Sequence, residues 1–110
     1  MSISFETPYH NFIKYENIKT IEIYNKFLNW IKGEFDLYLI EELDGLIVYF
    51  PNGWFSIMIF FERELDLKIV IKIKSKTLNS GIKIESQIKN VLGHLNQVYE
   101  NKGTNVLTQE

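Results

Sequence analysis

The sequence contains no cysteine. This absence excludes disulfide bonds, thiolate nucleophiles and zinc sites built on cysteine. Long hydrophobic runs are missing as well, because every apolar run is shorter than the roughly 18 residues that suggest a membrane-spanning helix. The first ten residues, MSISFETPYH, lack the basic and apolar regions of a signal peptide. We therefore expect a soluble, cytoplasmic protein.

The sequence also lacks a large excess of either acidic or basic residues. Twelve basic and 14 acidic residues give a net charge of −2, so the whole-chain charge favours neither nucleic acid nor a membrane as partner. Aromatic residues, in contrast, make up 15% of the chain and predict a core of bulky side chains. With 110 residues, the chain has the length of one domain. We expect that domain over residues 1–103 and a polar, frayed tail over residues 104–110.

The N-terminal segment predicts a short strand followed by a short helix. Residues 2–6 alternate apolar and polar side chains, which is typical of a strand. The pair Thr7-Pro8 then resembles a helix start, with threonine as N-cap and proline at the first helical position. The apolar face of this helix would contain Tyr9, Phe12 and Ile13.

Two longer segments show a clear helical period. Over residues 18–32, one stripe contains Ile21, Tyr24, Phe27, Leu28 and Ile31. Asn17 is the expected N-cap of this helix and Gly33 the expected residue after its end. Over residues 82–101, a second stripe contains Ile84, Ile88, Val91, Leu92, Leu95, Val98 and Tyr99.

Between these helices lie four segments that resemble strands, at residues 35–41, 46–50, 54–62 and 67–75. The links between them are short, and short links join adjacent antiparallel strands, because a parallel crossover needs a dozen or more residues. The predicted fold class is therefore α+β: an N-terminal helix, a four-stranded antiparallel meander sheet, and a C-terminal helix packed on the sheet.

The hairpin turn at Pro51-Asn52-Gly53 allows two registers. A three-residue loop suits the turn chemistry of these residues and places Phe50 opposite Trp54. A two-residue loop of Asn52 and Gly53 instead keeps the apolar faces of the two strands aligned. We predict the three-residue loop.

The last strand carries lysines on its polar face, at Lys68, Lys72, Lys74 and Lys76. Lysines on a terminal strand prevent edge-to-edge pairing with another sheet. The same stripe could contact phosphate groups. We favour the structural interpretation, because no aromatic residue or arginine interleaves the lysines along this strand.

The third strand is apolar on both faces, with Trp54, Met58 and Phe60 on one of them. A strand of this kind is usually covered on both sides, here by one helix on each face. If both helices instead lie on one face, Trp54, Met58 and Phe60 form an exposed patch of the sort that binds partners. The sequence leaves both alternatives open.

Acidic residues collect in the first and third turns of the predicted meander, which lie at the same end of the sheet. They are Glu41, Glu42, Asp44, Glu62, Glu64 and Asp66. Solvation alone explains acids in turns. The functional interpretation is a docking surface for a basic partner.

Few residues or motifs of the sequence indicate catalysis. The two histidines, His10 and His94, lie in different predicted elements, and no nucleophile, phosphate-binding or metal motif is present. We expect no enzymatic activity, no cofactor and no metal. The favoured hypothesis is a small protein-binding module, monomeric or homodimeric, such as an immunity or inhibitor protein that neutralises a basic toxin-like partner; nucleic acid and membranes are not expected. The alternatives are a dimeric secretion or assembly chaperone, a small-molecule-binding domain, and a nucleic-acid binder that uses the lysine stripe.

Overall fold

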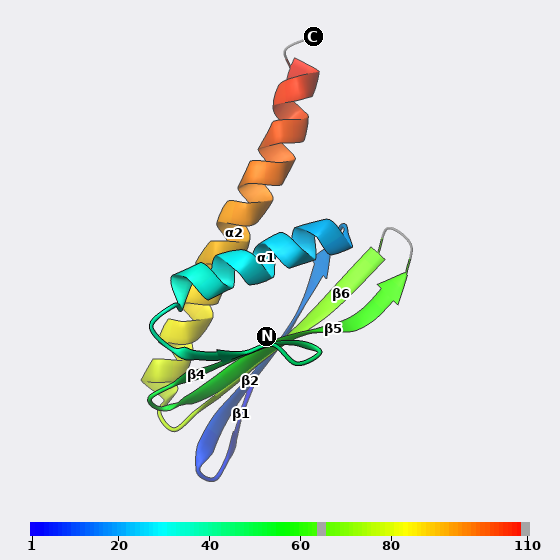
Figure 1. Cartoon of the computed structure of the whole chain (residues 1–110). Coiled ribbons are helices and arrows are strands. Elements are labelled where there is room, and N and C mark those ends of the chain that lie inside the picture. Colours follow the sequence, from blue (N-terminus) through cyan, green and yellow to red (C-terminus); the bar gives the residue numbers. More distant parts are fainter. Residues whose placement is uncertain (64–65, 109–110) are drawn as a thin grey trace.

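The computed structural model describes residues 1–63 and 66–108. It consists of one six-stranded antiparallel sheet and two helices (Figure 1). The strands follow the order β1-β2-β6-β5-β4-β3 across the sheet. The elements, in chain order, are β1 (Ser2–Glu6), β2 (Tyr9–Ile18), α1 (Ile21–Glu34), β3 (Leu39–Glu41), β4 (Gly45–Phe50), β5 (Gly53–Arg63), β6 (Asp66–Ser75) and α2 (Leu78–Thr108). The predicted α+β class and the antiparallel sheet are confirmed.

The prediction of a helix after Pro8 is wrong, because this segment forms β2. β2 pairs with β1 on one side and with β6 on the other, from His10 opposite Ser75 to Ile18 opposite Leu67. Pairing along this length overrides a local helix signal, and Thr-Pro marks turns as readily as helix starts. The sheet therefore has six strands rather than four, and α1 follows a hairpin.

The boundaries of α1 differ from those expected. Thr20 is the N-cap, and its side-chain oxygen accepts a hydrogen bond of 3.1 Å from the backbone N–H of Ile23. The expected cap, Asn17, is a residue of β2. Phe35, expected to begin a strand, instead ends the helix and packs its ring 5.0 Å from that of Phe55. Of the predicted strand over residues 35–41, only β3 forms.

The turn between β4 and β5 is a two-residue loop of Pro51 and Asn52, because Phe50 pairs with Gly53. The predicted three-residue loop is therefore wrong. The alternative loop of Asn52 and Gly53 has the observed length of two residues but lies one residue too late in the sequence. A side chain at Gly53 would overlap the backbone carbonyl of Lys74, so glycine permits β5 to approach β6 here. The amide of Asn52 donates a 2.8 Å hydrogen bond to the hydroxyl of Ser80, which ties the turn to α2.

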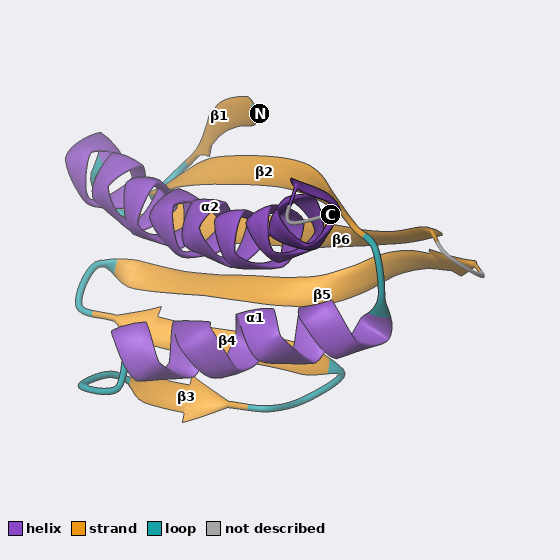
Figure 2. Cartoon of the chain, turned by 90° about the horizontal axis from the view of Figure 1, so that it is seen from above, coloured by secondary structure: helices purple, strands orange, loops and turns teal. Residues whose placement is uncertain are grey.

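Both helices cover the same face of the sheet, with α2 over β2 and β6 and α1 over β5 and β4 (Figure 2). The sequence left open whether the helices cover one face of the sheet or both, and in the structure they cover one. Side chains of this covered face form the core together with one side of each helix. Among the largest fully buried core side chains are Phe12, Phe27, Ile31, Phe35, Leu46, Phe55, Ile57, Ile69, Ile73 and Leu95.

Helix α2 begins earlier and ends later than predicted. It extends from Leu78 to Thr108, and the last two residues of the predicted tail, 109–110, lie outside the described residues. Across the part of the chain that the structure describes, neither helix combines the length and the apolar character that crossing a membrane requires.

Candidate functional site

No helix of residues 1–63 and 66–108 covers the second face of the sheet, and this open face carries a group of aromatic and aliphatic side chains. Strand alternation and the pairing registers assign these residues to the open face. We call the group the open-face patch. It comprises Tyr9, Ile13 and Tyr15 of β2, Val70 of β6, Trp54, Met58, Phe60 and Phe61 of β5, and Ile47 and Tyr49 of β4.

Two aromatic contacts join β2 to β5 across β6. The rings of Tyr15 and Phe60 lie edge to face with centroids 5.0 Å apart, and those of Tyr9 and Trp54 do so at 5.2 Å. Tyr15 remains 50% exposed and Phe60 60% exposed. Trp54 and Met58 are half-buried by their neighbours. The three residues predicted as a possible patch thus belong to one surface, to which β2 adds the rings of Tyr9 and Tyr15.

An irregularity in β5 places two consecutive aromatic residues, Phe60 and Phe61, on this surface. The pairing of β5 with β6 shifts between Ile59 and Phe61, as in a β-bulge. A bulge adds one residue to a strand, so the alternation between the two faces shifts for the residues beyond it. Phe60 is that added residue. The guanidinium of Arg63 lies 4.7 Å from the centroid of the Phe61 ring, which places a cation at this end of the patch.

Lysines of β6 cross the middle of the open face. β6 lies between β2 and β5, so Lys68, Lys72 and Lys74 do not protect a sheet edge, and that interpretation of them is wrong. The Nζ atom of Lys74 lies 5.8 Å from the centroid of the Trp54 ring. Aromatic side chains therefore do interleave the lysines, but they come from the neighbouring strands rather than from β6 itself.

The acidic residues at the predicted sheet end form two separate groups. Glu41, Glu42 and Asp44 flank the β3–β4 turn, whereas Glu62 and Asp66 belong to the β5–β6 hairpin; Glu64 lies outside the described residues. β4 begins opposite Met58, and β5 continues from there to Arg63, about 16 Å of strand at about 3.3 Å per residue. The second group therefore lies farther along the sheet than the first.

Two acids of the first group already have partners within the chain. Glu42 accepts a 3.0 Å hydrogen bond from the ammonium of Lys32, as an exposed salt bridge. Glu41 lies beside Tyr49 on the open face. Burial, together with the charge and the hydrogen bond of Glu41, raises the pKa of the Tyr49 phenol above its usual range. The salt bridge between Lys32 and Glu42 offsets one of the negative charges that this end offers to a partner.

The histidines do not form a catalytic arrangement. His10 lies in β2 with its ring 4.7 Å from that of Phe5, whereas His94 is exposed on α2. Among the residues that the structure describes, no group of three or more histidine and acidic side chains is arranged to hold a metal ion.

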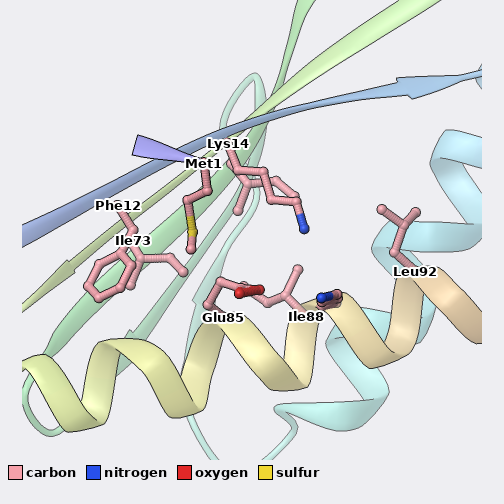
Figure 3. A pocket seen from close by; sticks show the side chains of 9 residues that line it. Met1, Phe12, Lys14, Ile73, Glu85, Ile88 and Leu92 are labelled. Atoms are coloured by element: carbon pink, nitrogen blue, oxygen red, sulfur yellow. The ribbon is translucent and has the colours of Figure 1, made fainter. Parts of the chain in front are cut away.

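A narrow groove lies between β2 and α2 (Figure 3). Phe12, Ile73 and Leu92 line it, and Lys14 and Glu85 face each other across it from the sheet and the helix. Its free volume is about 10 Å³, which is room for about one water molecule. The groove as it stands is too small for a metabolite.

Neither a protein-family model nor a curated protein sequence matches this chain.

Proposed function

We propose that this chain is a binding protein that docks another protein on the open-face patch. The observation that carries the proposal is the position of both helices on one side of the sheet, which leaves Tyr15, Trp54 and Phe60 without cover. Large exposed apolar surfaces on small domains commonly mark binding sites.

The composition of the patch favours a protein partner. Aromatic residues and methionine are enriched in protein interfaces, and tyrosine and tryptophan are frequent energetic anchors. Ile13, Met58 and Val70 add aliphatic surface, which suits apolar side chains of a partner. The lysines of β6 and Arg63 give the same face positive charge. The partner that fits this face therefore presents apolar anchors with acidic groups around them.

A protein that docks through such a face acts by occupying its partner's surface, as inhibitors and immunity proteins do. The basic partner expected from the sequence would dock on the acidic groups at the sheet end instead. Both surfaces can be tested with the same set of variants.

The experiment is affinity capture from the source cell with four forms of the tagged full chain. The first is the natural sequence, the second carries Tyr15→Ser and Phe60→Ser, the third carries Ile82→Ser as a control, and the fourth carries Glu62→Lys and Asp66→Lys. Ile82 is 47% exposed on α2, on the helix side of the molecule. We expect one protein to be retained by the natural chain and the control and lost from the second form. Equal retention by the first three forms, all folded, would refute docking on the open face, and loss from the fourth form would favour the acidic end.

A second candidate, a single-stranded nucleic acid, is favoured by one observation. Lys74 lies against Trp54, and Lys68 lies opposite Phe61, so cations and ring faces alternate as they do in nucleic-acid grooves. Fluorescence of Trp54, measured in a Trp30→Phe background, would be quenched by a single-stranded oligonucleotide at low salt, and the quenching would weaken steeply as salt is added. Unchanged fluorescence at low salt would exclude this candidate.

A further inference from the structure

The outer edge of β1 is a strand edge with unpaired backbone groups, and it is separate from the open-face patch. β1 is the first strand of the sheet and pairs with β2 from Ser2 opposite Ile13 to Glu6 opposite Tyr9. Within residues 1–63 and 66–108, no strand lies on its other side. In an antiparallel ladder, every second residue of such a strand directs its N–H and C=O groups away from its neighbour. These groups are free to pair with another strand.

β1 lacks the features by which proteins usually protect an edge strand. Charged side chains, proline and bulges prevent pairing between sheets. The sequence from Ser2 to Phe5 contains no charge and no proline, and its register with β2 is uninterrupted. Glu6, at the end of the strand, is its only charged residue. The opposite edge differs, because β3 has three residues and ends at Glu41.

The side chains of β1 also favour association. Ile3 pairs with Phe12, so it lies on the face that the helices cover elsewhere, and Phe5 lies on the same face. Yet Ile3 is 49% exposed and Phe5 is 56% exposed. A strand added beside β1 would cover both side chains and satisfy the free backbone groups at once.

We propose that this edge binds a second copy of the same chain, through antiparallel pairing of β1 with β1 about a two-fold axis at Ser4. In this register, Ile3 lies opposite Phe5 of the second copy, and Ser4 lies opposite Ser4 of the second copy. Ile3 and Phe5 of both copies then form one apolar cluster on the helix side. Glu6 lies opposite Ser2 of the second copy, so no like charges oppose each other. A second copy fits because this strand, whose single charge lies at its end, is complementary to itself.

The two-fold axis would stand perpendicular to the sheet, because antiparallel neighbours in one sheet are related in that way. The two sheets would become one continuous sheet, with all helices on one side and both open-face patches on the other. A strand pair of five residues is small against a standard interface, so we expect a reversible dimer that forms at micromolar concentrations or above. The proposal stands whether or not the open-face patch binds a protein.

The test is sedimentation equilibrium of the full chain between about 5 and 500 μM, with variants at Ser4. We expect the average mass of the natural chain to rise from one copy towards two. Ser4→Lys places two ammonium groups across the axis, and we expect that variant to remain monomeric, as should Ser4→Glu. Mixing equal amounts of Ser4→Lys and Ser4→Glu should restore the dimer, because opposite charges then face each other. Circular dichroism checks that each variant is folded.

Three results would overturn the proposal. One is a natural chain that stays monomeric to 500 μM. Another is a Ser4→Lys variant that dimerises as the natural chain does. The third is a dimer that Tyr15→Ser with Phe60→Ser abolishes and Ser4→Lys does not, because it would place the contact on the open face.

Discussion

The ring of Tyr15 lies edge to face against the ring of Phe60, with centroids 5.0 Å apart, although a whole strand separates them. Tyr15 belongs to β2 and Phe60 to β5, and β6 runs between these strands. The contact exists because alternation along β5 places Phe60 on the open face together with Met58, and the bulge adds Phe61 to the same face. It joins two large and mostly exposed side chains into one apolar surface.

This contact should contribute measurably but modestly to stability. We expect Tyr15→Ala and Phe60→Ala, combined in a double-mutant cycle, to show a coupling free energy of about 0.5–1.5 kcal/mol, as aromatic pairs do. Urea denaturation of the natural chain, both single variants and the double variant measures it. Strictly additive effects would show that the rings do not interact in solution.

Gly81 of α2 should resist substitution more than Gly93 of the same helix. A side chain at Gly81 would overlap the ring of Phe12, which is fully buried and cannot move aside, so we expect Gly81→Ala to cost about 1–3 kcal/mol. Nothing lies within 4 Å of a side chain added at Gly93, so Gly93→Ala should stabilise the protein by about 0.5–1 kcal/mol. Equal effects of the two variants on the free energy of unfolding would contradict the packing of α2 against β2.

Stability should fall at alkaline pH, in part through Tyr24. Burial raises the pKa of the Tyr24 phenol, so the folded protein holds this proton more tightly than the unfolded chain does. This contribution is fully present below about pH 10, the ordinary tyrosine pKa, and is lost as the pH rises through the folded-state value. Urea denaturation at pH 8 and pH 11 should show a larger loss for the natural chain than for Tyr24→Phe. Identical losses would indicate that Tyr24 titrates as it does in water.

Glu85 should be a site at which a substitution stabilises the fold. One carboxylate oxygen of Glu85 is buried in the groove between β2 and α2 without a hydrogen-bond partner among the described residues. We expect Glu85→Met to raise the free energy of unfolding by about 1 kcal/mol, because it removes that unpaired acceptor. Asn90→Met, at an exposed position of the same helix, is the control and should change stability by less than about 0.5 kcal/mol. A destabilised Glu85→Met variant would indicate that the carboxylate has a partner in solution.

The sequence predicts most of the helices and strands but not how they pack together. Strands β4, β5 and β6 and both helices overlap the segments in which hydrophobic periodicity predicts them, because burial determines that periodicity. β2 was missed because Thr7-Pro8 resembles a helix start. The alternation of apolar and polar residues from Ile13 to Glu16 was the signal that could have identified it as a strand.

Because β2 was predicted as a helix, most of the candidate site could not be predicted either. Without β2, β6 looks like a sheet edge, and its lysines look like edge protection. With β2 in place, β6 is an inner strand, and Tyr9 and Tyr15 lie beside its lysines. Which face the helices cover could not be read from the strands either, because β5 is apolar on both faces.

The most direct test of docking on the open face is photocrosslinking in the source cell. A photoreactive phenylalanine analogue is introduced in place of Phe60 in one form of the chain and in place of Ile82 in another. We predict that the analogue at position 60 crosslinks to one discrete protein and that the analogue at position 82 does not. Crosslinking to the same protein from both positions, or no crosslinked protein from position 60 in a folded chain, would contradict the account.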